Sequence, residues 1–310
     1  MTETHSPYSG VFAAALTAMD AELNPDIDRM ARHCNWLLAN GCDGLAILGT
    51  TGEANSFGLK ERIQLIEGLA AAGVPADRMM PGTGCCAIPD SVALTKAALD
   101  TGAKGVLMLP PFYYKNPSDD GLFAGFSEVI QRLGDDRLKI YLYHFPQMST
   151  VPFSYDLIER FLKEYPTTIV GMKDSSGDLE NMAGAAERFP GFAVFPGSDE
   201  LFLPTLRRGG AGCITACANV ISTELGALWR AWRADGDNAD VDAVNTSLSA
   251  ARRVISQYPL PPALKALMAR HSDDDGWMVL RPPLMNLSDA DRQKLYGEFD
   301  GVGVSLPQAA

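Results

Sequence analysis

The stretch "TIVGMKDSSGD", residues 168–178, runs from an apolar segment into a lysine and then into a turn of small hydroxyl and acidic residues. Ile169, Val170 and Met172 suit a strand buried on both faces, because successive side chains of a strand point to opposite sides. A lysine chosen at random is usually a solvated charge. The position of Lys173 at the end of this strand therefore has to be judged against the other strand ends.

Seven further apolar runs share this character, and amphipathic segments lie between the runs. The other runs begin at Val11, Gly44, Arg78, Gly105, Lys139, Phe192 and Ala211. Continuous apolar runs are typical of parallel strands covered on both faces. Helices are expected over residues 26–41, over 119–134 with Ser118 as the N-cap, and over 155–166 with Ser154 as the N-cap.

Eight strand–helix units predict an α/β fold, a (β/α)8 TIM barrel. A doubly wound open sheet is the alternative, but it usually carries a glycine-rich dinucleotide loop after its first strand, and "ALTAMDAELN" at residues 15–24 has none. Four helical segments follow the eighth run, over residues 222–234, 240–258, 261–272 and 288–299. We expect an N-terminal tail at 1–8, the barrel at 9–235 and a C-terminal helical region at 236–310 packed on the barrel.

Composition excludes several classes of function. The net charge is −12 and no run of lysines and arginines occurs, so no nucleic-acid partner is expected. No apolar stretch reaches the length of a membrane span, and no signal peptide precedes the six cysteines, which predicts a cytoplasmic protein with free thiols. Cys213 and Cys217 have no second pair at zinc-site spacing, so no metal site is predicted.

The carboxyl ends of parallel barrel strands meet on one rim, where catalytic groups collect. "GTTGE" at 49–53 offers Gly49 and two threonine hydroxyls as a small anion-binding turn, although the motif taken alone favours a glycine-rich turn with a helix cap. "PPFYYKN" at 110–116 carries two tyrosines, and "YLYHFPQMS" at 141–149 carries Tyr143 and His144. With Lys173, these side chains converge on one predicted rim.

This set of residue types suits Schiff-base chemistry. A lysine amine must be neutral to attack a ketone, and burial in an apolar barrel mouth favours the neutral amine. A nearby tyrosine hydroxyl can transfer protons while the carbinolamine collapses and a C–C bond forms or breaks. An anion-binding turn would hold the carboxylate of a 2-oxo acid so that its ketone meets the amine. Taken alone, Tyr143 could be an amphipathic core aromatic.

The combination of "GTTGE", a tyrosine ending the run from Lys139, and "VGMKDSSGD" resembles the dihydrodipicolinate synthase/N-acetylneuraminate lyase family. The opening segment, residues 10–53, also resembles that family, and the likeness extends over roughly Ser9 to Leu295. The resemblance implies a class I reaction on pyruvate or a related 2-oxo acid that needs no cofactor other than the covalent imine.

The resemblance also implies roles for individual residues. Lys173 would form the imine and Tyr143 would act as the general acid and base. Thr50 would join the tyrosines in a proton relay, while Thr51 would hold the pyruvate carboxylate.

Two further residues also resemble residues of the family, in addition to the lysine, the tyrosine and the two threonines. Tyr114 resembles a tyrosine that reaches across a dimer interface into the neighbouring site, and Ile214 resembles a residue lining the pyruvate pocket. The resemblance implies a homotetramer built as a dimer of dimers.

Two positions depart from the pattern of dihydrodipicolinate synthases. Those enzymes carry an arginine five positions after the strand-end tyrosine, where it binds the carboxylate of aspartate semialdehyde, and this chain has Met148. The change removes a bidentate charged contact, which argues against the lysine-pathway reaction. His144 replaces the usual asparagine, and we expect it to form part of the pocket wall or its support.

Other residues favour a hydroxylated substrate. Ser175 lies two positions after the lysine, where sugar-acid lyases carry a hydroxyl residue. Asp199 and Glu200 in "PGSDE" resemble the acidic pair with which sialic acid lyases bind a polyol, and carboxylates accept hydrogen bonds from sugar hydroxyls. The same two acids could simply open the next helix, where negative charge is favourable.

The sequence thus predicts a Schiff-base lyase, or aldolase, that reversibly cleaves a 2-oxo-3-deoxy sugar acid to pyruvate and an aldehyde. Three alternatives stay open. The chain could be a 4-hydroxy-tetrahydrodipicolinate synthase, a dehydratase that expels a hydroxyl through the same imine, or a noncatalytic sensor of sugar acids or amino acids.

Overall fold

The predicted strand segments form the framework of the computed structural model, which describes residues 6–304 and 306–307. Within these residues, all of the predicted segments but one contain an assigned strand. The exception, the segment from Arg78, still pairs in parallel with β3 (Val106–Met108): the Thr83 N–H donates to Leu107 O at 2.9 Å, and the Leu107 N–H donates to Pro81 O at 2.9 Å. The prediction of parallel, fully buried strands is confirmed.

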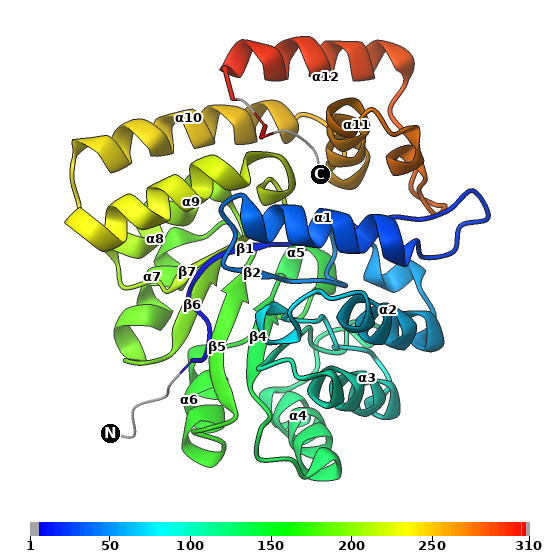
Figure 1. The fold of residues 1–310 in the computed structure, drawn as a ribbon. Coiled ribbons are helices and arrows are strands. Elements are labelled where there is room, and N and C mark those ends of the chain that lie inside the picture. Colours follow the sequence, from blue (N-terminus) through cyan, green and yellow to red (C-terminus); the bar gives the residue numbers. More distant parts are fainter. Residues whose placement is uncertain (1–5, 305, 308–310) are drawn as a thin grey trace. The chain divides into compact units, whose positions relative to one another are not determined.

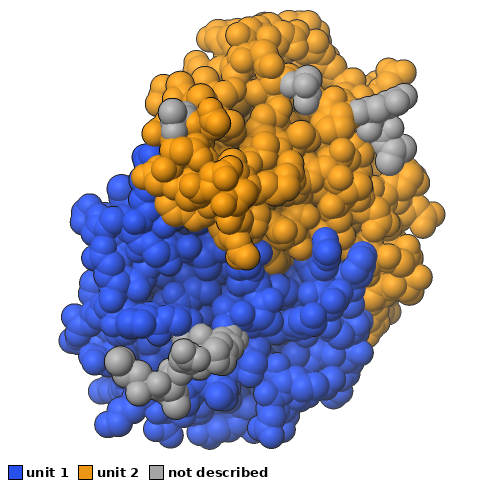
Figure 2. All heavy atoms as spheres, turned by 60° about the vertical axis from the view of Figure 1, so that its left-hand side comes forward, with its two compact units in different colours: residues 1–9, 75–213 blue, residues 10–74, 214–310 orange. Residues whose placement is uncertain are grey.

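The chain divides into two compact units, which Figure 2 colours separately. The first unit comprises Met1–Ser9 and Pro75–Cys213, and the second comprises Gly10–Val74 and Ile214–Ala310. This division differs from the predicted boundaries at residues 8 and 235, which stay predictions. Residues 1–5, 305 and 308–310 of the predicted tail and C-terminal region lie outside the described residues.

The first unit contains a four-stranded parallel sheet in the order β3-β4-β5-β6, with helices around it (Figure 1). Its other strands are β4 (Ile140–His144), β5 (Ile169–Asp174) and β6 (Ala193–Pro196). Its helices are η2 (Ala76–Arg78), α3 (Ile88–Thr101), α4 (Asp119–Leu133), α5 (Pro146–Ser149), α6 (Tyr155–Glu164), α7 (Leu179–Arg188), η3 (Asp199–Leu201) and α8 (Phe202–Arg207).

Two helices of the first unit, α4 and α6, begin where the sequence predicts. The Ser118 hydroxyl accepts from the Gly121 N–H at 3.2 Å, and the Ser154 hydroxyl accepts from the Leu157 N–H at 3.1 Å. Both serines therefore satisfy a backbone donor that the first helical turn leaves open. Strand residues such as Leu142 then pack on the apolar faces of α4, α6 and α7 in one core cluster, and each buried Leu, Ile or Phe contributes roughly 1.5–3 kcal/mol.

The second unit contains a sheet in the order β2-β1-β7 and most of the remaining helices. Its strands are β1 (Gly10–Ala13), β2 (Gly44–Leu45) and β7 (Gly212–Thr215), which crosses the division between the units. Its helices are α1 (Ile27–Ala39), η1 (Ala54–Ser56), α2 (Leu59–Ala71), α9 (Ala218–Asp235), α10 (Ala239–Ile255), α11 (Leu260–Ser272), η4 (Asp275–Met278) and α12 (Asp289–Val302).

The four helices expected after the last strand are present as α9 to α12, and they pack on one another (Figure 1). Asp26 begins α1 by accepting from the Arg29 N–H at 2.9 Å. None of the described helices is long and apolar enough to span a membrane. All six cysteines lie in the described part of the chain, and none forms a disulfide.

Candidate active site

Lys173 and Tyr143 lie side by side at the ends of neighbouring strands of the first unit. They are register partners in the parallel pairing of β4 with β5, so their side chains leave the sheet on the same face. Lys173 Nζ donates to the Tyr143 hydroxyl at 3.4 Å and lies 4.5 Å from the centre of the tyrosine ring. Lys173 is 4% exposed and Tyr143 is 5% exposed. The lysine is therefore buried against a phenol rather than solvated.

Aromatic rings surround the base of Lys173 on this face of the sheet. Its register partner on β6 is Phe195, and Phe195 meets Tyr141 edge to face at 5.9 Å between ring centres. Gly171, two residues before the lysine, leaves room for these rings, because a Cβ there would lie 2.4 Å from Ala193 O and 2.8 Å from the Tyr141 ring. The glycine in "VGMK" is thus required by close packing beneath the lysine.

The opposite face of the same strand ends carries His144 and Asp174, which are also register partners. Asp174 Oδ1 accepts from the Ser176 N–H at 2.7 Å, and Asp174 Oδ2 accepts from Asn181 Nδ2 at 2.6 Å. Asp174 is fully buried, so these bonds fix the turn that follows Lys173. Sequence reasoning assigned no role to Asp174, although an acidic residue directly after a buried strand lysine was a visible signal.

His144 lies on the face away from Lys173. Its Nδ1 accepts from the Phe153 N–H at 3.2 Å, and its ring lies 6.4 Å from the Phe153 ring. Burial lowers the pKa of His144, while the Asp174 and Asp178 carboxylates partly oppose that effect. This geometry suits support of the strand end, and contact of His144 with substrate stays a prediction.

Ser175, Asp199 and Glu200 belong to the same unit as Lys173. Ser175 follows the strand directly, and its hydroxyl would lie 2.2 Å from a Cβ at Gly197, so the ends of β5 and β6 approach closely there. Asp199 is fully buried and Glu200 is partly buried, and both lie in η3, which leads into α8. The acids therefore do open a helix, as one interpretation expected, and their contact with a polyol stays a prediction.

Tyr114 projects from the first unit instead of packing into it. It is 79% exposed, its neighbour Tyr113 is 73% exposed, and their rings meet edge to face at 5.3 Å. Two adjacent exposed tyrosines are unusual on a surface that faces only water. Met148, on α5, is also exposed, at 59%.

The "GTTGE" turn lies in the second unit together with Ile214. Leu48, directly before the turn, and Glu53, its last residue, both have φ of 55°, a left-handed conformation that side-chain-bearing residues rarely adopt. The Thr17 hydroxyl holds the turn by donating to Gly52 O at 2.7 Å. Such a constrained turn keeps its backbone fixed, which suits an anion-binding role.

Within that turn the threonines differ in exposure. Thr51 is 6% exposed and Thr50 is partly exposed. A Cβ at Gly49 would meet no atom within 4 Å, so open space lies beside that backbone. Ile214, on β7, is fully buried. The roles of all four residues toward a substrate stay predictions.

A buried ion pair anchors the last residue of this turn, and sequence reasoning missed it. Lys265 Nζ on α11 donates to Glu53 Oε1 at 2.5 Å and to Val279 O at 2.7 Å, and neither charged side chain has exposed surface. The Arg281 N–H donates to Glu53 Oε2 at 3.3 Å. The signal was a lone lysine in the apolar helix segment "PPALKALMA", because such a lysine has to be paired.

Comparisons with known proteins place this geometry in context. The sequence profile described as the Dihydrodipicolinate synthetase family matches residues 7–299 of the chain. An uncharacterized DapA-like lyase from Chloroflexus aurantiacus is 34% identical over 94% of this chain and 96% of its own length. The 4-hydroxy-tetrahydrodipicolinate synthase 2 of Halalkalibacterium halodurans is 30% identical over 96% of this chain and 99% of its own length.

A solved structure extends the likeness to the fold. The dihydrodipicolinate synthase of Agrobacterium tumefaciens is 31% identical, covers 95% of this chain and 99% of its own, and matches with a TM-score of 0.87. The fold class is therefore α/β, a (β/α)8 TIM barrel with a C-terminal helical region, as the sequence predicted.

Proposed function

The chain belongs to the dihydrodipicolinate synthetase family of pyruvate-dependent class I lyases, and from this premise we propose that it cleaves a 2-oxo-3-deoxy sugar acid to pyruvate and an aldehyde. The observation that carries the proposal is the contact of the Lys173 amine with the Tyr143 hydroxyl at 3.4 Å, buried on an aromatic face. This pairing supplies a nucleophile and a proton carrier at one point.

The reaction begins with the attack of the Lys173 amine on the C2 ketone of the substrate. Loss of water gives a protonated imine, and Tyr143 supplies and removes the protons that this step requires. Tyr143 then takes the proton of the C4 hydroxyl, the C3–C4 bond breaks, and its electron pair passes into the imine to give an enamine and a free aldehyde. Protonation of the enamine at C3 and hydrolysis of the imine release pyruvate and restore the lysine.

Thr51 and the backbone at Gly49 would bind the substrate carboxylate in this scheme, and Thr50 would pass protons to the tyrosines. The constrained backbone from Leu48 to Glu53 supports that assignment, because a fixed turn presents its N–H groups without further ordering. Ile214 would line the pocket for the methyl end of pyruvate. Ser175, Asp199 and Glu200 would accept or donate hydrogen bonds to the hydroxyls of the aldehyde part.

Synthesis of 4-hydroxy-tetrahydrodipicolinate from pyruvate and aspartate semialdehyde is the second candidate. The names of the relatives from Halalkalibacterium halodurans and Agrobacterium tumefaciens favour it. Met148 opposes it, because a thioether cannot replace a guanidinium that binds the carboxylate of aspartate semialdehyde.

A comparison of substrates under one assay tests the proposal. The enzyme is given a panel of 2-oxo-3-deoxy sugar acids, and released pyruvate is measured by coupling to lactate dehydrogenase. In parallel, pyruvate consumption is followed with aspartate semialdehyde. Pyruvate release from a sugar acid with little consumption by the semialdehyde supports the proposal. The reverse pattern identifies the synthase, and loss of water without pyruvate release identifies a dehydratase.

The variant Met148→Arg helps to distinguish cleavage of a sugar acid from synthesis with aspartate semialdehyde. The variant restores the charged group on an exposed position of α5, so it should not disturb folding. Under our proposal it improves use of aspartate semialdehyde and leaves imine formation with pyruvate unchanged.

We also propose that the working enzyme is a cytoplasmic homotetramer, a dimer of dimers, in which Tyr114 enters the site of a neighbouring subunit. The exposure of Tyr113 and Tyr114 supports such an interface. Light scattering gives the oligomeric mass. Tyr114→Ala should lower the oligomeric mass or reduce turnover, while Lys173 should still form the imine with pyruvate.

A further inference from the structure

The "GTTGE" turn of the second unit is held in a backbone conformation that side-chain-bearing residues disfavour. Leu48 and Glu53 both have φ of 55°, in the left-handed region where a side chain is strained. Residues persist in such conformations only where the surrounding structure fixes them, and they collect at functional sites. The strained backbone at both ends of the turn therefore requires contacts that hold it, and neighbouring segments of the second unit supply them.

The segment that follows β1 holds one peptide of the turn. The Thr17 hydroxyl donates to Gly52 O at 2.7 Å. The N–H of the same peptide, which belongs to Glu53, donates to Thr50 O at 3.1 Å. A planar trans peptide points its C=O and N–H in opposite directions, so these two bonds fix its orientation. Thr17 is fully buried, and a Cβ at Gly52 would lie 2.8 Å from Ala15 O, so the turn packs directly on this segment.

The C-terminal helical region holds the last residue of the turn. Glu53 Oε1 accepts from Lys265 Nζ at 2.5 Å, and Glu53 Oε2 accepts from the Arg281 N–H at 3.3 Å. Lys265 Nζ also donates to Val279 O at 2.7 Å, which joins α11 to the segment that carries Arg281. Neither side chain of the ion pair has exposed surface, so bulk water does not screen the attraction. Both carboxylate oxygens of Glu53 are thus held by the C-terminal region.

Arg281 ties the same segment to the chain that follows the turn. Its guanidinium donates to Leu23 O at 2.7 Å and to Ser56 O at 2.6 Å. It also forms an ion pair with Glu61 on α2 and lies 4.3 Å from the centre of the Phe57 ring. All five N–H groups of the guanidinium find an acceptor in these contacts. The segment that holds Glu53 is therefore fixed on η1 and α2 as well.

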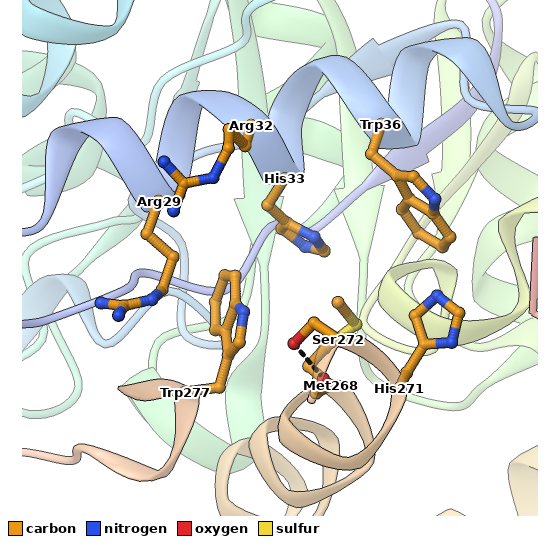
Figure 3. Close-up of a pocket in the computed structure, with 8 residues that line it drawn as sticks. All are labelled: Arg29, Arg32, His33, Trp36, Met268, His271, Ser272 and Trp277. Carbon is orange, nitrogen blue, oxygen red and sulfur yellow. Dashed lines mark hydrogen bonds between the residues drawn. The ribbon is translucent and has the colours of Figure 1, made fainter. Parts of the chain in front are cut away.

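The segment formed by α11 and η4, which carries Lys265, is fixed on α1 in turn (Figure 3). Asp274, between the two helices, accepts from Arg29 Nε at 2.7 Å, and the Trp277 ring meets the His33 ring at 4.9 Å between ring centres. Figure 3 shows Trp277 facing His33 across a pocket of only about 50 Å³. The support behind the ion pair is thus closely packed, so the position of α11 is passed to the turn.

We propose that Thr17 and Glu53 are positioning residues for the carboxylate of a 2-oxo acid. This inference rests on the proposed function, in which Thr51 and the backbone at Gly49 bind that carboxylate. Thr17 and Glu53 act through the turn and not by contact with the substrate: they hold its peptide planes so that the carboxylate meets donors that are already oriented. The C-terminal helical region thereby contributes to substrate affinity through Glu53.

A purely structural role for these contacts leads to a different expectation. Contacts that only stabilise the fold would, when removed, lower the melting temperature and weaken all 2-oxo compounds alike. Contacts that position the turn would, when removed, weaken selectively the compounds that carry a carboxylate. Pyruvate and methyl pyruvate separate these two cases, because both offer the ketone that forms the imine and only pyruvate carries the negative charge.

The test measures imine formation by borohydride trapping in the full-length protein over a series of probe concentrations, with the adduct on Lys173 quantified by mass spectrometry. In the parent protein, half-maximal trapping should require at least about tenfold less pyruvate than methyl pyruvate. Thr17→Val keeps the shape of the side chain and removes the donor. It should raise the half-saturating concentration of pyruvate about tenfold, and leave that of methyl pyruvate within about twofold and the maximal adduct unchanged.

Two further substitutions control this result. Thr17→Ser keeps the hydroxyl, so it should restore the parental value for pyruvate. Thr95→Val is the matched control in the first unit: Thr95 is also fully buried, and its hydroxyl donates to the Thr83 hydroxyl at 3.1 Å. This variant loses a buried hydrogen bond far from the turn in sequence, and it should change the half-saturating concentration of neither probe.

A double variant tests the other side of the turn and keeps the inference testable should Thr17→Val not fold. Glu53→Leu with Lys265→Met removes both charges of the ion pair together, so that neither is left buried alone. We expect the same selective loss for pyruvate as with Thr17→Val. Melting temperatures of all variants show that the trapping is measured on folded protein.

The outcomes separate this inference from the proposed function. An unchanged affinity for pyruvate in Thr17→Val and in the double variant, or an equal weakening of both probes, overturns the inference alone. Equal trapping of pyruvate and methyl pyruvate by the parent protein overturns the carboxylate-binding role of the turn together with it. No adduct in the folded parent protein overturns the proposed function itself.

Discussion

Two lysines are buried in the described part of the chain, and their surroundings differ in kind. Lys265 donates to a carboxylate at 2.5 Å and to a backbone carbonyl at 2.7 Å. Lys173 makes no ion pair within 4.0 Å among the described residues, and its amine donates to the hydroxyl of Tyr143 and lies over the Tyr143 ring. Burial alone therefore does not mark a reactive lysine. The partner distinguishes an amine that is held in an ion pair from one that lies against a phenol.

The pKa of the paired lysine fits a structural role. Burial lowers the pKa of Lys265, and the adjacent Glu53 carboxylate raises it in opposition. The pair ties α11 to the residue that ends the "GTTGE" turn. Loss of this ion pair should therefore lower the free energy of unfolding, whereas loss of Lys173 should lower the rate of turnover.

The largest expected effect comes from Lys173→Met. Turnover and borohydride trapping with pyruvate should both disappear, because no other amine of the site can form the imine. The melting temperature should stay close to that of the parent protein, since methionine fills the same apolar space and no ion pair is broken. Residual turnover near the parental rate would remove Lys173 from the mechanism.

Tyr143→Phe tests the partner of the reactive lysine. Turnover should fall by about 10²–10⁴-fold, because the proton carrier is lost while the ring is kept. Trapping with pyruvate should remain detectable after longer incubation. Steady-state rates and intact-protein mass spectrometry measure the two effects, and an unchanged rate would exclude the tyrosine as a proton carrier.

Lys265→Met should destabilise the fold by about 3–5 kcal/mol, because Glu53 is left buried without its counter-charge. The double variant Glu53→Leu with Lys265→Met should recover most of that loss. The matched control is Lys294→Met on α12, where an exposed lysine lies 3.7 Å from Glu298, and no measurable change is expected. Denaturant unfolding gives the free energies, and equal effects at both lysines would contradict the contrast drawn here.

The smallest expected effect is a pH dependence from His33, another buried basic group of the second unit. Its folded pKa of about 4 lies below the ordinary value of 6.5, so the unfolded chain binds the proton more readily between these values. The free energy of unfolding should therefore fall by about 3 kcal/mol as the pH drops from 6.5 to about 4, and then level off.

His33→Gln keeps an N–H donor for Asn219 but does not titrate, so it isolates this contribution. His271 interacts electrostatically with His33 and also has a lowered pKa, so it should keep a weaker dependence of the same sign in the variant. A parallel pH profile in parent and variant would show that His33 does not titrate on unfolding.

The sequence predicted the parts of this molecule that local pattern controls. Buried runs identified the strands, the Ser118 and Ser154 caps identified helix starts, and the shared rim of parallel strands brought Tyr143 and Lys173 together. Side-chain alternation could also have placed His144 on the other face from Tyr143, since adjacent strand residues point in opposite directions.

The parts that escaped prediction depend on packing between distant segments. Glu53 and Lys265 are 212 residues apart, and no spacing rule connects them. The pocket lined by His33, Trp36 and Trp277 likewise forms only where α1 meets α11 and η4, and His33 Nε2 there lies 2.8 Å from Asn219 Oδ1, which is 186 residues away in the sequence. Sequence pattern reports which residues are buried, but it does not report which partner each buried polar group finds.

Peptide mapping after borohydride reduction in the presence of pyruvate tests the contrast between the two lysines most directly. Reduction converts an imine into a stable secondary amine, so the modified lysine is found by mass spectrometry. We predict a pyruvyl adduct on the peptide containing Lys173 and none on the peptide containing Lys265. An adduct on Lys265, or no adduct on Lys173 in the folded protein, would contradict this account.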